Sequence, residues 1–310
     1  MNRPFLKLST LFVSLVLFFL GISESYSLEF DHVLSFGKFG IGREQYDTPV
    51  DIVEDSDENL YILDKKNYRV QKVNFRGEFI TQWGRRGFRD GEFKDPRSIA
   101  IDRSGDIYVV DTGNNRIQKF SPDGDFILSF GKVGSATGNL RYPTDMTFDK
   151  AENIYIADSG NHRIQKFDKS FQFIQEWGRF ERTGKELKQP YSVAYSDDGF
   201  GHVYVADSSD CRIQKFDTRG NLKKEWDLHL PGKGFLCGGV KIKVEPRSYD
   251  LYVADVENDV VLVFDKEGEP VGELGEARKR FSKPAGLFVN DSVELYVVDS
   301  GNNEIHKFRR

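Results

Sequence analysis

Two aspartates stand at matching places in the sequence and could bind a cation or polarise a bound ligand. Asp51 and Asp145 each lie two residues after a proline, in the motifs Pro49-Val-Asp and Pro143-Thr-Asp. Carboxylate oxygens that face one space are the ligands that hard cations prefer. The structural alternative is that each carboxylate accepts backbone N–H bonds at the start of a strand.

The same position recurs with other residues in four further segments. Counted from the corresponding proline, or from Cys237 where the proline is missing, the series continues with Ser98, Ser192, Gly239 and Gly286. Lys241 lies two residues beyond Gly239 and places a charge where other segments have Val53, Ala100, Thr147 or Ala194. We therefore expect Lys241 either to neutralise an aspartate or to contact a ligand.

Other catalytic chemistries find little support in the sequence. It has no nucleophile elbow, no phosphate-binding loop and no histidine pair at helical metal spacing. None of the five histidines falls at the positions just described; they are His32, His162, His202, His229 and His306. The sequence assigns no catalytic residue and no cofactor, with a divalent cation at Asp51 and Asp145 left as the open exception.

These residues belong to a repeat that predicts the fold. A segment of the type YVVDTGNNRIQKF occurs six times, and its aspartates recur at intervals of 47, 47, 49, 48 and 44 residues from Asp64 to Asp299. In the second repeat, four β-type stretches at residues 98–101, 107–110, 116–120 and 126–130 are separated by turn residues. Repetition of four antiparallel strands predicts an all-β, six-bladed β-propeller with almost no helix.

The two ends of this chain are expected to close the ring. The sixth repeat ends at Arg310, directly after its third strand, and so lacks an outer strand. Residues 32–37 (HVLSFG) match residues 126–131 (FILSFG), the outer strand of the second repeat, at four of six positions. Because an open ring leaves an unpaired edge, we expect the N-terminal strand to complete the last blade.

The repeat resembles the NHL repeat across essentially all of residues 28–310, which we predict to form one propeller domain. The shared pattern is a proline, an apolar inner strand and then [I/L]-Y-[V/I]-x-D-x-x-N-x-R-I-Q-K-F. The resemblance leaves function open, since NHL proteins include RNA-binding and protein-binding modules, sensor ectodomains and, more distantly, an amidating lyase. Lactonase-like six-bladed propellers hold calcium through oxygen ligands, so the resemblance admits calcium at Asp51 and Asp145.

Residues that recur in nearly every blade are expected to serve the blade, because a ligand would touch the ring unequally. An arginine follows the repeat's aspartate by five residues in four blades and stands near an asparagine or aspartate. We predict charge-assisted hydrogen bonds that hold the turn in place. The arginines are Arg69, Arg116, Arg163 and Arg212.

The two faces of the predicted ring carry unequal charge. Six inter-blade loops lead from the outer strand of one blade to the inner strand of the next, on the face that we call the top. They contain 17 lysines and arginines against 8 acidic residues, in a chain of net charge −5. Such a face attracts an acidic or polyanionic partner, or is simply solvated. The candidate ligand-binding residues are Arg85, Arg86, Arg89, Arg97, Arg179, Arg182, Tyr191, Lys241, Arg278, Lys279 and Arg280.

The N-terminal segment predicts export. Residues 1–27 combine Arg3 and Lys7, an apolar run over residues 8–22 and small residues around a cleavage point, as a signal peptide does. An uncleaved anchor is the alternative; after cleavage we expect no membrane span and a secreted or periplasmic protein. Cys211 and Cys237 lie on the same rim of adjacent blades, so we expect a disulfide, with two buried thiols as the alternative.

Two functional hypotheses follow. The leading one is an exported, non-enzymatic scaffold that binds a protein, a polysaccharide or another anionic partner through its basic top face and channel mouth. The alternative is a metal-dependent hydrolase or lyase, of the lactonase or amidating-lyase type, that acts at the channel mouth. Export and the net negative charge argue against a nucleic-acid partner.

Overall fold

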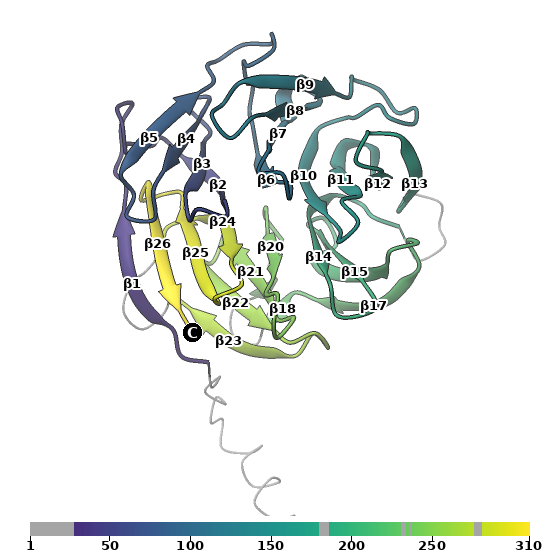
Figure 1. Cartoon of the computed structure of the whole chain (residues 1–310). Coiled ribbons are helices and arrows are strands. Elements are labelled where there is room, and N and C mark those ends of the chain that lie inside the picture. Colours follow the sequence, from purple (N-terminus) through teal and green to yellow (C-terminus); the bar gives the residue numbers. More distant parts are fainter. Residues whose placement is uncertain (1–27, 180–185, 231–233, 236, 276–280) are drawn as a thin grey trace, which may run out of the picture.

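The computed structural model describes residues 28–179, 186–230, 234–235, 237–275 and 281–310. Six four-stranded antiparallel sheets stand around one axis as the blades of a propeller (Figure 1). The predicted all-β, six-bladed architecture is thereby confirmed. Within the described ranges, no helix is long and apolar enough to span a membrane. The predicted signal peptide, residues 1–27, lies outside the described residues.

Each blade runs from an inner strand at the axis to an outer strand at the rim. Blade one consists of β2 (Pro49–Glu54), β3 (Leu60–Asp64), β4 (Arg69–Val73) and β5 (Phe79–Trp83). Blade two consists of β6 (Ser98–Ile101), β7 (Ile107–Asp111), β8 (Arg116–Phe120) and β9 (Phe126–Phe130). Blade three consists of β10 (Pro143–Phe148), β11 (Ile154–Asp158), β12 (Arg163–Phe167) and β13 (Phe173–Trp177). The stretches predicted for the second repeat match these bounds, except that β7 extends one residue further, to Asp111.

The remaining blades follow the same plan. Blade four consists of β14 (Pro190–Ser196), β15 (His202–Asp207), β16 (Arg212–Asp217) and β17 (Leu222–Asp227). Blade five consists of β20 (Lys241–Val244), β21 (Leu251–Asp255), β22 (Val260–Phe264) and β23 (Pro270–Leu274). Blade six consists of β24 (Pro284–Val289), β25 (Glu294–Asp299), β26 (Glu304–Arg309) and β1 (Asp31–Phe36). The loop into blade five contains a short hairpin of β18 (His229–Leu230) and β19 (Gly234–Phe235).

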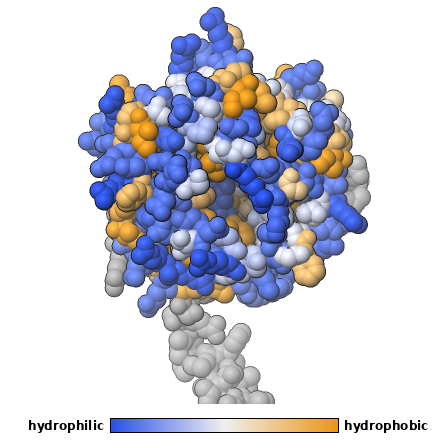
Figure 2. Space-filling model, in the orientation of Figure 1, coloured by the Kyte–Doolittle hydropathy of each residue, from blue (hydrophilic) through white to orange (hydrophobic). Residues whose placement is uncertain are grey.

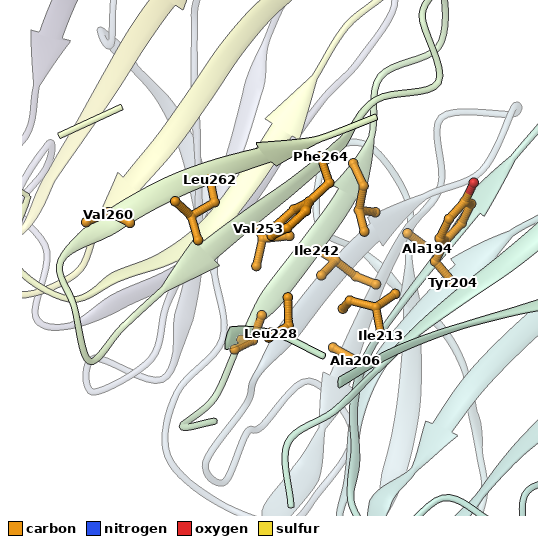
Figure 3. Close-up of a cluster of buried hydrophobic side chains, with 12 residues drawn as sticks. Ala194, Tyr204, Ala206, Ile213, Leu228, Ile242, Val253, Val260, Leu262 and Phe264 are labelled. Atoms are coloured by element: carbon orange, nitrogen blue, oxygen red, sulfur yellow. The ribbon is translucent and has the colours of Figure 1, made fainter. Parts of the chain in front are cut away.

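The core consists of apolar layers between neighbouring blades. Because each sheet is covered on both faces, its second strand is apolar without alternation and fully buried, as in β3 and β21. Figure 3 shows one such layer between blades four and five, where Tyr204 and Ile213 face Ile242 and Val253. Burial of an apolar side chain of this size contributes about 1.5–3 kcal/mol, so these layers hold the blades in order.

Aromatic residues at the ends of outer strands also join neighbouring blades. The Trp83 indole lies against Gly124 in the next blade, where a Cβ atom would stand 2.6 Å from the ring. Gly124 has φ +93°, so the turn needs glycine both for its backbone and for the contact. In blade three Phe171 takes the equivalent left-handed position and stacks on Phe130 at 4.4 Å.

The N-terminal strand closes the ring as predicted. β1 pairs antiparallel with β26, from Asp31 opposite Arg309 to Phe36 opposite Ile305. In Figure 1, β1 (purple) lies beside β26 (yellow), so both ends of the propeller domain meet in blade six.

The expected disulfide is present and joins two blades on the top face. Cys211, at φ 52°, lies in the turn between β15 and β16, and it is bonded to Cys237 in the loop into blade five. In blades two, five and six the residue at this turn position accepts a hydrogen bond from the next inter-blade loop, as Asn115 does from the Tyr142 amide at 2.8 Å. The disulfide thus takes the place of an inter-blade hydrogen bond.

Replacing both cysteines with serine should lower the free energy of unfolding by about 3 kcal/mol, because the bridge closes a loop with a sequence separation of 26 residues. Urea unfolding of the double variant measures the change. The wild type in reductant should unfold at the same urea concentration as the variant. Equal stability of oxidised wild type and variant would contradict the prediction.

Candidate functional site

Five polar side chains from the first five blades meet at the axis of the propeller. They come from equivalent positions on the inner strands, and all are buried. We call them the axial cluster; its members are Asp51, Ser98, Asp145, Ser192 and Lys241. Blade six contributes Gly286, where a Cβ atom would lie 2.6 Å from the Asp51 Cα, so the backbones pack directly there.

The Lys241 ammonium lies between the two aspartates. Its Nζ atom is 2.8 Å from Asp51 Oδ2, 2.7 Å from Asp145 Oδ1 and 3.1 Å from Ser98 Oγ. An ammonium has three donors, so all three are used. The expectation that Lys241 either neutralises an aspartate or contacts a ligand is resolved in favour of the first, and a ligand-binding role for its ammonium is not supported.

The structure corrects the register that the sequence predicted for blade five. Lys241 pairs with Ala254, as Asp51 pairs with Leu63 and Asp145 with Ala157, so Lys241 and not Gly239 is the fifth member of the series. The residue in register with Val53 is Lys243, which pairs with Tyr252. The missing proline before blade five explains the error, because the count started from Cys237.

The remaining acceptors of the axial cluster are also satisfied. Asp51 Oδ2 accepts the Ile99 amide at 3.0 Å, and Asp145 Oδ2 accepts the Val193 amide at 2.9 Å. The structural alternative for the aspartates, acceptance of N–H bonds at a strand start, is therefore present: Asp51 accepts the Ile52 amide and Asp145 the Met146 amide of its own strand, and each accepts a further amide from the next blade. The latter bonds connect blade one to blade two and blade three to blade four.

Electrostatics in the channel follow from this pairing. Burial opposes the ionisation of Asp145, but Lys241 and Lys243 outweigh it and hold the pKa of Asp145 below its usual value. Burial also opposes the charge on Lys241, but Asp145 and Asp51 raise its pKa well above the usual value. Burial and the neighbouring Lys241 lower the pKa of Lys243, for which the described residues offer no ion-pair partner.

The axial cluster does not fit a divalent cation. A calcium ion between Asp51 and Asp145 would need the space and the oxygen atoms that the Lys241 ammonium uses. Among the residues that the structure describes, no three histidine, cysteine or acidic side chains gather as a metal site. The calcium position expected at Asp51 and Asp145 is thus filled by a side chain of the protein itself.

A second group of polar residues lies directly above the axial cluster, where the inner strands begin. Arg97 donates to the Tyr191 hydroxyl at 3.1 Å and to the Tyr142 hydroxyl, and its Nε lies 3.3 Å from Asp95. Arg97 precedes Ser98 and Tyr191 precedes Ser192 in the chain, so the group spans blades two to four at the top of the channel. We call Asp95, Arg97, Tyr142 and Tyr191 the mouth cluster. Figure 2 shows a hollow at the centre of one largely hydrophilic face of the ring.

Burial, neighbouring charges within the mouth cluster and Lys65 together shift the pKa values of Asp95 and Tyr142. Burial opposes the charge of Asp95, but Lys65, at 2.7 Å, and Arg97 outweigh it and lower the pKa of this carboxyl. Burial and Asp95 raise the pKa of Tyr142, against the opposing effect of Arg97, so this phenol stays protonated at neutral pH. The cluster therefore brings a carboxylate, a guanidinium and a phenol into hydrogen-bond contact with one another.

The structure gives separate local contacts for the other predicted ligand-binding residues that it describes. Arg97 and Tyr191 are brought together, and Tyr142 and Asp95 are members that the sequence prediction missed. Arg85 forms an ion pair with Glu92 at 2.9 Å, and Arg86 lies over the Tyr68 ring. Arg89 contributes its backbone carbonyl to Arg116, and Arg179 pairs with Glu176 at 2.5 Å. The others lie outside the described residues: Arg182, Arg278, Lys279 and Arg280.

The repeated arginines have the structural role that was predicted. Arg163 Nε lies 2.8 Å from Asp158, and its other nitrogens donate to Ser135, Ala136 and Asn139 carbonyls of the inter-blade loop. Asp158 in turn accepts the Arg141 amide of that loop at 2.7 Å. In blade six His306 replaces part of this network, 3.3 Å from Asp299.

Comparison with known proteins agrees with the fold. The family model of the NHL repeat matches residues 93–120 and 140–167. No curated protein matches the sequence significantly. Two solved lyases match in structure at 14% identity. One is a catalytically inactive histidine variant of virginiamycin B lyase from Staphylococcus aureus with quinupristin, with a TM-score of 0.61 over 91% of this chain and 88% of the lyase. The other is a streptogramin B lyase, with a TM-score of 0.62 over 93% and 99%.

A gluconolactonase from Xanthomonas campestris matches at 18% identity and a TM-score of 0.63, over 85% of this chain and 87% of that enzyme. The leading hypothesis, a non-enzymatic binding scaffold, is contradicted by these comparisons, which favour its alternative, because the two lyases and the gluconolactonase named here are enzymes. At this identity the likeness establishes the fold alone. A protein or anionic polymer as partner of the top face stays a prediction.

The histidines of this chain lie away from both clusters as far as they are described. His162 Nδ1 contacts the Lys188 carbonyl on the rim of the top face, and His202 pairs with Asp198 on the opposite face. His306 is buried within β26, next to His32. The side chain of His229 is outside the described residues.

Proposed function

We propose that this protein is an enzyme, a hydrolase or lyase of the lactonase-like propellers, that acts at the top mouth of the channel. The observation that carries the proposal is the mouth cluster, where Arg97 joins two phenols and a carboxylate from three successive blades. The lyases and the lactonase that share the fold support this reading over a binding scaffold. The metal-dependent form of the hypothesis is not supported at Asp51 and Asp145, where Lys241 takes the cation's place.

The substrate class that fits the cluster is a small ester or lactone whose carbonyl becomes negatively charged during reaction. Arg97 can bind the developing oxyanion, because a guanidinium offers several donors in a fixed plane. The Tyr191 hydroxyl accepts a hydrogen bond from Arg97, and no described acceptor takes its own proton. We therefore assign Tyr191 the role of proton donor.

Asp95 is the base that this arrangement offers. Its lowered pKa keeps it ionised at neutral pH, and it lies beside both Arg97 and Tyr142. In hydrolysis it would take a proton from the attacking water, and in elimination a proton next to the carbonyl. The two reactions use the same groups, so the products and not the geometry distinguish them.

Mutation of the mouth cluster should remove the activity without unfolding the protein. We expect Tyr191→Phe to lower kcat/KM for its best ester or lactone substrate by about 100-fold, the usual contribution of a proton donor. Mass spectrometry of the products identifies the reaction, because hydrolysis adds one water and elimination adds none. Arg86→Lys, on the same face but stacked on Tyr68, is the matched control and should retain full activity.

Two outcomes would contradict the proposal. One is that a panel of sugar lactones, aliphatic lactones and ester-containing cyclic peptides shows no turnover. The other is that Tyr191→Phe and Arg97→Lys turn over at the wild-type rate. We further propose a location outside the cytoplasm, supported by the Cys211–Cys237 disulfide.

A further inference from the structure

The charges inside the channel balance without any external ion. Asp51 and Asp145 carry two negative charges, Lys241 lies against both, and Lys243 stands within electrostatic reach of the same carboxylates. No other charged side chain from the inner strands enters the series, since the equivalent positions hold Ser98, Ser192 and Gly286. A buried ion that lacked such compensation would cost several kcal/mol.

We infer that Lys241 is the resident cation of this channel and replaces a divalent metal at the axis. Its ammonium holds blade five against blades one, two and three, because its three acceptors are Asp51, Ser98 and Asp145. A metal bound to the same carboxylates would draw together the blades that carry them. This inference concerns the axis of the fold and stands whether or not the proposed reaction is correct.

The hydrogen bonds of the axial cluster are arranged around an ammonium group, which carries a single positive charge. Asp145 Oδ1 accepts Lys241 Nζ and Ser98 Oγ, at 2.7 and 2.6 Å, besides the Met146 amide. Asp145 Oδ2 accepts the Ser192 hydroxyl, which itself accepts the Ile242 amide at 3.1 Å. Every carboxylate oxygen of Asp145 is thus engaged by donors of the protein, and calcium could enter only if the ammonium left.

Removal of the ammonium should therefore create a calcium site that the wild type lacks. In Lys241→Ala, Asp51 and Asp145 face a space without a cation, and Ser98 Oγ offers a further oxygen. Calcium binds carboxylate and neutral oxygen atoms together, so Asp51, Asp145 and Ser98 would supply the types of ligand that it prefers. The same substitution leaves all residues of the mouth cluster in place.

The test is calcium binding by the purified propeller after treatment with a chelator. Isothermal titration calorimetry of Lys241→Ala should show one calcium ion bound per chain, and millimolar calcium should raise its melting temperature. The wild type should show neither effect. Lys241→Ala/Asp145→Asn is the matched control and should lose the binding, because one of the two carboxylates is gone.

Two results would overturn the inference. One is stoichiometric calcium binding by the wild type that is lost in Asp145→Asn. The other is that neither Lys241→Ala nor the milder Lys241→Gln binds calcium or gains thermal stability from it. If Lys241→Ala does not fold without calcium, the variant is refolded once with calcium and once with a chelator. The inference then predicts that only calcium restores the β-sheet circular dichroism spectrum.

Discussion

Replacing Lys241 with methionine is expected to lower the free energy of unfolding at neutral pH by about 3–5 kcal/mol. Methionine keeps the apolar stem of the side chain but removes the ammonium that lies 2.8 and 2.7 Å from Asp51 and Asp145. Two buried carboxylates would then face each other without a counter-charge, and Ser98 would lose a donor. Urea unfolding at neutral pH measures the loss.

The dependence of this loss on pH follows from the direction of the pKa shifts. In the wild type the pKa of Asp145 is lowered, so the pair's stabilisation is present above the pKa of an unfolded aspartate, about 3.9, and is lost as the pH falls through the lowered value. The pKa of Lys241 is raised, so its contribution is present below about 10.4 and is lost as the pH rises through the raised value. Between about pH 3.9 and about pH 10.4, the contribution of this ion pair to the stability of the wild type should thus be nearly constant.

The variant should behave in the opposite way on acidification. Without Lys241, one of the facing carboxylates should titrate at a raised pKa, so the folded state gains stability as the pH falls from 7 towards 5, as expected for two like charges close together. Lys243→Met is the matched control in the same channel. The pKa of Lys243 is lowered by burial and by Lys241, so its loss should cost little or stabilise the protein. A Lys241→Met variant as stable as the wild type at neutral pH would refute the ion-pair argument.

Much of the fold was predictable because every blade repeats the same turn residues. The second blade was placed almost to the residue, since Pro96, Gly105 and Gly124 mark its boundaries. The inner strand of blade five was misplaced by two residues because no proline stands directly before it. A count back from the strand-end aspartate would have found Lys241. Lys241 precedes Asp255 by 14 residues, and in the other blades the equivalent residue precedes the strand-end aspartate by 13–15 residues. Gly239 precedes Asp255 by 16 residues.

The functional site was less predictable, because it lies where the repeat is broken. Tyr142 stands before its proline where other blades have Thr48, Asp95, Gln189 or Lys283, so no pattern marks it. The sequence did contain one signal. In two successive blades a tyrosine adjoins the proline that begins the inner strand, at Tyr142-Pro143 and Pro190-Tyr191. The role of the basic residues of the top face stays a prediction. A charge count over loops does not reveal which arginines are paired, as Arg85 is with Glu92.

Removal of residues 28–37 should have an effect at least as large as the loss of Lys241. The segment supplies β1, the outer strand of blade six, and its Leu28 and Phe30 pack against the core between blades five and six. Phe36 packs against the core between blades six and one. At about 1.5–3 kcal/mol for each apolar side chain, the loss should reach about 5 kcal/mol. It would also expose β26 as an unpaired edge, which favours self-association.

Two measurements separate strand closure from a general effect of truncation. A chain that begins at Leu28 should unfold at the same urea concentration as the longer protein, whereas one that begins at Lys38 should unfold much earlier and tend to form oligomers. A synthetic peptide of residues 28–37 added in trans should restore stability to the shorter chain, because its strand can pair with β26, and a scrambled peptide should not. Unchanged stability of the chain that begins at Lys38 would show that blade six does not need β1, and the closure of the ring would then have to lie in the contacts of β24 and β25 with β2.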